Sequence, residues 1–162
     1  MRRAQVSVWA VLTVVAFSAA PASAVWADGA GLRLDGAGVS YVGADLRVLA
    51  VDARSDSSGP AEGTVSFVHV APAGVSRFVG TVTCLSQDDT GQVQFSGQVL
   101  EGVTAAGAVL TGKDFFFTLL VGDEPQAFSL PGFADAGARG GCSGGSAQRV
   151  PVTYGGYLEG IA

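Results

Sequence analysis

The residues best suited to chemistry are a serine in a glycine-rich segment and the single histidine of the chain. Ser143 lies in the middle of residues 141–145, which satisfy the G-x-S-x-G pattern of nucleophilic serines. A serine nucleophile needs an imidazole base and a carboxylate that orients this base. His69 is the only imidazole, and Asp88 lies between it and Ser143 in the sequence. These residues define one functional hypothesis, a serine hydrolase that uses Ser143 and His69.

The sequence around Ser143 meets few of the requirements of such an enzyme. A nucleophile elbow places the serine between a strand and a helix, and residues 141–145 are flanked by neither. The segment also resembles that around the nucleophile of trypsin-like serine proteases, whose His–Asp–Ser order matches His69, Asp88 and Ser143. That family has two barrels, which need more than the 138 residues that follow Ala24, and its histidine motif is absent around His69. We therefore expect no catalytic residues and no enzymatic activity.

Carboxylates are grouped in turns, where they are candidates for binding a cation or another ligand. Asp88 with Asp89, and Asp123 with Glu124, form such groups. Ca²⁺ takes about six to eight oxygen ligands, and the chain has no D-x-D-x-D-G loop to supply them. One histidine cannot build a zinc site when both cysteines form a disulfide. We therefore expect no metal and no cofactor, and we keep Asp88, Asp89 and Asp123 as candidate ligand contacts.

His69, Tyr154 and Tyr157 are the remaining candidate ligand contacts. Carbohydrate-binding β-domains often expose a row of aromatic side chains. Tyr154 and Tyr157 are three residues apart on an expected strand, so their side chains should point to opposite faces and form no common platform unless a bulge at Gly155 and Gly156 realigns them. His69 shares a strand face with Val65 and Phe67, which favours a hydrogen-bonded position at the margin of the core.

The charge of the chain excludes two classes of partner. Nine basic residues stand against 14 acidic ones, a net charge of −5. Nucleic-acid binders and proteins that bind anionic membranes need clustered Lys and Arg, which this chain lacks. We therefore expect neither nucleic acid nor a membrane surface as partner. The expected partner is an extracellular ligand or a cell-surface component whose identity the sequence does not give.

The first 24 residues have the features of a secretory signal peptide. Arg2 and Arg3 give a positive start, residues 6–19 are uncharged and apolar, and residues 22–24 form an A-x-A cleavage site. We expect cleavage after Ala24, which exports residues 25–162 as one domain without a membrane anchor. Disulfides form in that environment, so we expect Cys84 and Cys142 to be bridged.

After residue 24 the sequence predicts short β-strands and almost no helix. Strands are expected at 31–42, 44–53, 63–70, 75–86, 92–100, 113–121, 126–130 and 148–158, separated by Gly, Pro, Asp and Ser. Alternation in 92–100 predicts one buried face, and the apolar run in 113–121 predicts a central strand covered on both faces. The expected fold is all-β, a single antiparallel β-sandwich or flattened β-barrel of seven to nine strands. An exposed edge strand leaves homodimerisation open.

Phe67 and His69 follow Gly63 in one expected strand, and the aromatic strand 115–121 is followed by residues 122–130. These two segments resemble a family of small secreted β-domains of actinobacterial type. The resemblance covers about residues 43–130. It implies an extracellular β-domain with no established activity, and it brings no catalytic residues.

The leading functional hypothesis is a secreted, non-enzymatic β-domain that serves as a binding or surface-structural module. The first alternative is a small β-barrel that carries an apolar ligand, with Val93, Phe115 and Phe117 lining a cavity. The serine hydrolase is the weakest of the three. Displacement of an apolar dye distinguishes the first two.

Overall fold

The protein consists of β-strands, most of them long, joined by short turns. The computed structural model describes residues 31–56, 60–122, 125–137, 141–142 and 146–161. The strands are β1 (Leu32–Val42), β2 (Asp45–Ser55), β3 (Ala61–Ala71), β4 (Gly74–Gln87), β5 (Gln92–Val103), β6 (Asp114–Leu120), β7 (Ala127–Ser129), β8 (Gly132–Ala134), β9 (Arg149–Pro151) and β10 (Tyr154–Ile161). Within these ranges no helix is long and apolar enough to cross a membrane.

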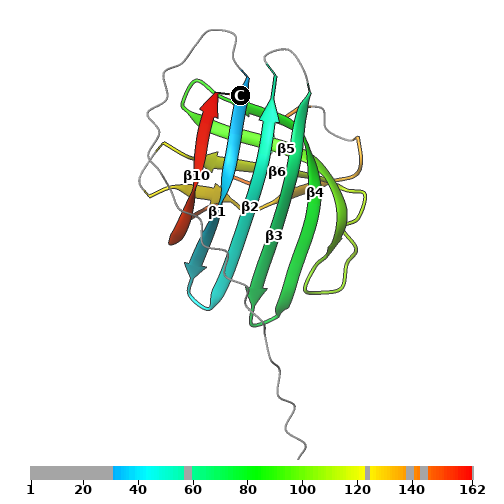
Figure 1. The fold of residues 1–162 in the computed structure, drawn as a ribbon. Helices are drawn as coiled ribbons and strands as arrows, with labels where there is room; N and C mark the ends of the chain where they lie inside the picture. Colours follow the sequence, from blue (N-terminus) through cyan, green and yellow to red (C-terminus); the bar gives the residue numbers. More distant parts are fainter. Residues whose placement is uncertain (1–30, 57–59, 123–124, 138–140, 143–145, 162) are drawn as a thin grey trace, which may run out of the picture.

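All strands belong to one antiparallel sheet that curls into a half-barrel. The order is β10-β1-β2-β3-β4-β5-β6-β7-β9, and β8 pairs with β6 beside this path. β10 and β1 to β4 lie side by side in one layer, and the later strands cross behind them (Figure 1). The register between β4 and β5 shifts at Val79/Gly80 and at Val82/Cys84. Such irregularities bend and twist a strand, so they lie where the sheet turns from one layer to the other.

The two edges of the sheet are joined by a short link and by one glutamine side chain. Val152 and Thr153 connect β9 to β10 and donate their N–H groups to Gln126 O (2.7 Å) and Val39 O (2.6 Å). Gln126 Oε1 accepts a hydrogen bond from Tyr157 N at 2.8 Å, and Gln126 Nε2 donates to Tyr157 O at 3.0 Å and to Val121 O at 2.8 Å. The side-chain amide thus takes the place of a strand residue opposite Tyr157.

Phenylalanine rings fill the space between the two layers. Phe67, Phe78, Phe95, Phe115 and Phe117 are all at least 96% buried. Their ring centroids lie 5.2 to 6.2 Å apart, which is contact distance for aromatic pairs. The rings come from β3, β4, β5 and β6, so one aromatic cluster connects the front layer to the back layer.

The structure confirms the all-β antiparallel fold. Residues 113–121 form a central strand as expected, with both Phe115 and Phe116 buried although they face opposite sides. The expected last strand, 148–158, is two strands, β9 and β10, on opposite edges of the sheet. The segment between the expected strands 126–130 and 148–158, where no strand was predicted, contains the three-residue strand β8. The expected signal peptide lies outside the described residues.

The disulfide is confirmed and ties β4 to the segment after β8. Cys84 on β4 is bonded to Cys142, 58 residues later in the sequence. Next to the bridge, the Ser96 hydroxyl donates a hydrogen bond to Gly141 O at 3.0 Å. A structural disulfide is typical of proteins that work in an oxidising environment.

Candidate functional site

His69 is paired with an aspartate, although not with the one expected for a hydrolase. His69 Nε2 lies 3.2 Å from Asp45 Oδ2. The Asp88 carboxylate bonds instead to Thr90 and to Gln92 N within its own turn. Ser143 lies outside the described residues. The described residues therefore do not include the serine of the hypothesised hydrolase site.

Of the candidate cation ligands, the structure describes Asp88 and Asp89, which share one turn. The Asp88 carboxylate accepts hydrogen bonds from the side chain of Thr90 and from the N–H groups of Thr90 and Gln92, and these bonds lower its pKa. The same hydrogen bonds stabilise the turn that contains Asp88. Asp89 is exposed in the same turn, and Asp123 lies outside the described residues. No group of three or more His, Cys, Asp or Glu side chains that could hold a metal ion occurs among the residues described.

The two candidate tyrosines lie on opposite faces of β10, as their spacing predicted. Tyr157 is 1% exposed, and its hydroxyl donates a hydrogen bond to Leu49 O at 3.0 Å. Burial raises the pKa of the Tyr157 phenol. Tyr154 is 65% exposed and meets Tyr41 edge to face, with ring centroids 6.2 Å apart. Of the two, only Tyr154 is available to a partner.

Tyr154 belongs to a larger apolar surface on the outer side of the front layer. Cross-strand pairing aligns outward side chains of β10, β1, β2, β3 and β4 in rows. We define the apolar face by three such rows: Tyr41, Leu46, Val70 and Val75; then Tyr154, Val39, Val48 and Val68, with Arg77 at the β4 end; then Ala37, Ala50, Ser66 and Val79. Tyr41 is 54% exposed and Val75 is 47% exposed.

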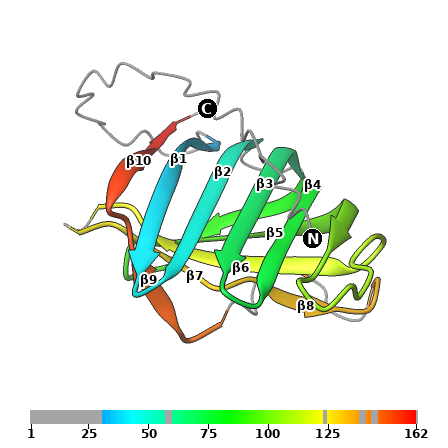
Figure 2. The same cartoon turned by 90° about the horizontal axis from the view of Figure 1, so that it is seen from below.

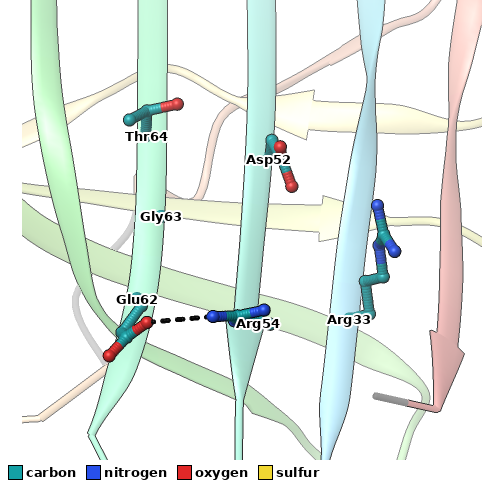
Figure 3. A pocket seen from close by; sticks show the side chains of 6 residues that line it. All are labelled: Arg33, Asp52, Arg54, Glu62, Gly63 and Thr64. Atoms are coloured by element: carbon teal, nitrogen blue, oxygen red, sulfur yellow. Dashed lines mark hydrogen bonds and ion pairs between the residues drawn. The ribbon is translucent and has the colours of Figure 1, made fainter.

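Beyond the third row the same outer surface becomes charged. Asp35 and Asp52 form the next row with Thr64, and Arg33, Arg54 and Glu62 form the last. Arg54 Nη2 lies 3.3 Å from Glu62 Oε2, beside a hollow of about 340 Å³ that these two residues line together with Arg33, Asp52, Gly63 and Thr64 (Figure 3). Both side chains of this pair are at least 70% exposed, so the pair contributes little to stability. The hollow is polar and open to water.

A buried arginine lies on the inner side of the same strands, behind the apolar face. Arg47 is 6% exposed and pairs through Nη2 with Asp45 Oδ2 at 2.7 Å, the oxygen that also contacts His69. Its Nε and Nη1, and the neighbouring Ser40 Oγ, are buried without a hydrogen-bond partner. Leaving such groups unpaired costs about 1–3 kcal/mol each. Because these atoms are sealed from solvent, the cluster positions Asp45 and His69 but offers no open binding site.

Comparison with known proteins adds no assignment. No family model, curated protein or solved structure matches this chain. The resemblance to small secreted β-domains stays an expectation.

Proposed function

We propose that this chain is a non-enzymatic β-domain that is exported after cleavage behind Ala24 and acts as a binding or surface-structural module through its apolar face. The observation that carries this proposal is the exposure of the face. Tyr41 and Tyr154 are more than half exposed, and Val70 and Val75 stand beside them at 37% and 47%. A soluble domain gains by covering such a surface with a partner, because each Å² of apolar area removed from water stabilises by about 25 cal/mol.

Two further observations support a binding role over the alternatives. The interior rings, including Phe115 and Phe117, are fully buried and in mutual contact. A carried apolar ligand would have to displace them, which costs close-packed contacts. The Cys84–Cys142 bridge supports export to an oxidising environment.

The proposal is tested by sizing the exported protein directly in the medium or surface wash of producing cells, without purification. We expect the wild-type chain in a complex larger than one copy, with an intact mass of residues 25–162 less two hydrogens after dissociation. Val48→Lys, in the middle of the apolar face, should elute as a single chain because it buries a charge in the contact. Thr64→Lys is the matched control on the same surface, outside the face, and should keep the complex. A wild-type chain that elutes alone would overturn the proposal.

A further inference from the structure

We propose that the hollow located where β1 and β3 begin and β2 ends binds a small neutral sugar through its hydroxyl groups. The hollow lies beyond the apolar face, so this inference does not rest on the proposed use of that face. β1, β2 and β3 are neighbours in the front layer, and the described strands of the back layer lie on their inner side (Figure 2). Those strands therefore leave the hollow, which is on the outer side, open to a ligand.

The side chains around the hollow stand on backbone that is paired on both sides. Cross-strand pairing places Arg54 between Arg33 and Glu62 in one row. Asp52 and Thr64 are partners in the next row. Figure 3 shows these five side chains around the hollow, with Arg54 directed toward Glu62. Because β1, β2 and β3 each pair with two neighbouring strands, the starting points of the side chains are fixed before a ligand arrives.

The charges that line the hollow cancel, which favours a neutral ligand. Two arginines stand against the carboxylates of Asp52 and Glu62. Arg54 Nη2 lies 3.3 Å from Glu62 Oε2, and Arg33 Nη2 lies 3.8 Å from Asp35 Oδ2. An anion in the hollow would be repelled by the carboxylates, and a cation would be repelled by the arginines. A neutral ligand meets neither repulsion.

The hollow presents hydrogen-bond donors and acceptors side by side. A guanidinium group has five N–H donors, and a carboxylate has two acceptor oxygens. Within the described part of the chain, Arg54 donates to Glu62, whereas the 3.8 Å between Arg33 and Asp35 is too long for a hydrogen bond. A sugar hydroxyl both donates and accepts, so neighbouring hydroxyls can bond to a guanidinium and to a carboxylate without separating the ion pair. Hydrogen bonds to charged groups are the stronger kind.

Two pairs of like charges also meet at this place. Arg33 lies opposite Arg54, and Asp35 lies opposite Asp52, across β1 and β2. Like charges directly opposite each other destabilise a sheet. Proteins keep such conflicts with stability mainly at functional sites. A hydroxyl oxygen that accepts hydrogen bonds from both guanidinium groups would offset the repulsion between them.

The size and the lining of the hollow limit the ligand and its affinity. The volume of about 340 Å³ is near the lower end of the range for small-molecule sites, roughly 300–1,000 Å³. None of the residues that line it is aromatic, so the sugar is held by hydrogen bonds rather than by stacking. We therefore expect a mono- or disaccharide unit to bind with a dissociation constant in the millimolar range. The affinity should not change with added salt, because the ligand carries no charge.

The test is a titration of the purified chain, with its disulfide intact, followed through the NMR signals of the arginine Nε–H groups. The probes are maltose, cellobiose, lactose and diacetylchitobiose, each added up to about 50 mM, with inorganic phosphate and tetramethylammonium as charged comparisons. At least one disaccharide should shift the signals of Arg33 and Arg54, with the same midpoint at low and high salt. The signal of Arg149 should not move. Arg149 is an exposed arginine of the back layer that likewise donates to one side chain, that of Gln92.

Four variants locate the sugar. Asp52→Ala removes a charged acceptor and should weaken binding about tenfold. Thr64→Lys places a long cationic side chain in the hollow and should abolish binding. Arg149→Gln, on the other layer, and Val48→Lys, in the apolar face, should bind the sugar like wild type. Circular dichroism and intact mass check that each variant is folded and bridged.

Each outcome decides the inference. Absence of a shift with all four disaccharides overturns it, and so does a shift of Arg33 and Arg54 with phosphate alone. Equal affinities of Asp52→Ala and wild type would place the sugar elsewhere and also overturn it. The proposed function is decided separately, by the size of the complex in the culture medium. A chain that elutes alone but binds a disaccharide in the hollow would refute the role of the apolar face and support the sugar site.

Discussion

Replacement of Gln126 by alanine should remove the three side-chain hydrogen bonds that, together with the Val152–Thr153 link, join the two edges of the sheet. The amide of Gln126 makes three hydrogen bonds, two to the backbone of Tyr157 and one to Val121 O, at 2.8 to 3.0 Å. Each contributes about 1 kcal/mol net, and the Tyr157 N–H beside a buried side chain would be left without its acceptor. We expect Gln126→Ala to lower the free energy of unfolding by about 3 kcal/mol.

The assay is urea unfolding followed by far-ultraviolet circular dichroism. Gln98→Ala is the matched control, because Gln98 is exposed and its side chain makes only a long hydrogen bond to Gly112 O at 3.5 Å. The control should stay within about 0.5 kcal/mol of wild type. Equal free energies of unfolding for the two variants would refute the assigned role of Gln126.

Two related variants probe the same contact. A methyl group on Gly156 would lie 2.8 Å from Gln126 Oε1, so Gly156→Ala should destabilise by displacing the amide. The two substitutions act on one interaction, so the double variant should lose less than the sum of the single losses. Gln126→Glu places a carboxylate against two carbonyl oxygens, which raises its pKa in the folded state. Its stability should therefore be greatest at acidic pH and be lost as the pH rises through that pKa.

Three further predictions concern single groups. Burial raises the pKa of the Tyr157 phenol, so stability should fall as the pH rises above about 10, the pKa in the unfolded chain. An alkaline absorbance titration in which this phenol ionises before unfolding would contradict the assignment. Reduction of the Cys84–Cys142 bridge should lower the free energy of unfolding by about 4 kcal/mol, because it opens a 58-residue loop; urea titration with and without reductant measures this, and an unchanged midpoint would count against it. Burial also raises the pKa of Glu159, so Glu159→Gln should be more stable than wild type at pH 7, with the difference shrinking in acid. A difference that does not vary with pH in thermal melts would argue against that cause.

Local sequence patterns were sufficient to predict most strands. The alternation in 92–100 correctly placed Val93, Phe95 and Val99 in the core, because one-sided burial leaves a period of two in the sequence. The division of 148–158 into β9 and β10 could not be predicted in this way. Val152 and Thr153 carry the chain from one edge of the sheet to the other. The β-propensity of these residues does not indicate that the strand before them and the strand after them pair with different neighbours.

The candidate site depends more on which strands are neighbours than on any one strand. The run from Val48 to Val51 is apolar on both faces. This run is the sequence feature that indicates apolar side chains on the outer side of β2 as well as on its inner side. The face itself arises only when β10 pairs with β1, which brings Tyr154 beside Tyr41 across more than 100 residues of sequence. The hydrogen bonds of the Gln126 side chain to the backbone of Tyr157 could not be predicted from the sequence either, because they depend on the curvature that brings the sheet edges together.

The pairing of β1 with β10 also determines how the domain responds to mechanical load. Leu32 pairs with Ile161, so the two ends of the sheet-forming chain leave the molecule side by side at the same end of neighbouring antiparallel strands. Their hydrogen bonds run perpendicular to the strands. A force that pulls these two ends apart therefore loads the bonds one after another, as in a zipper, rather than all together in shear. The domain should open at low force from this end, and the last pair to separate should be Val39 with Tyr154, where Thr153 N also bonds to Val39 O.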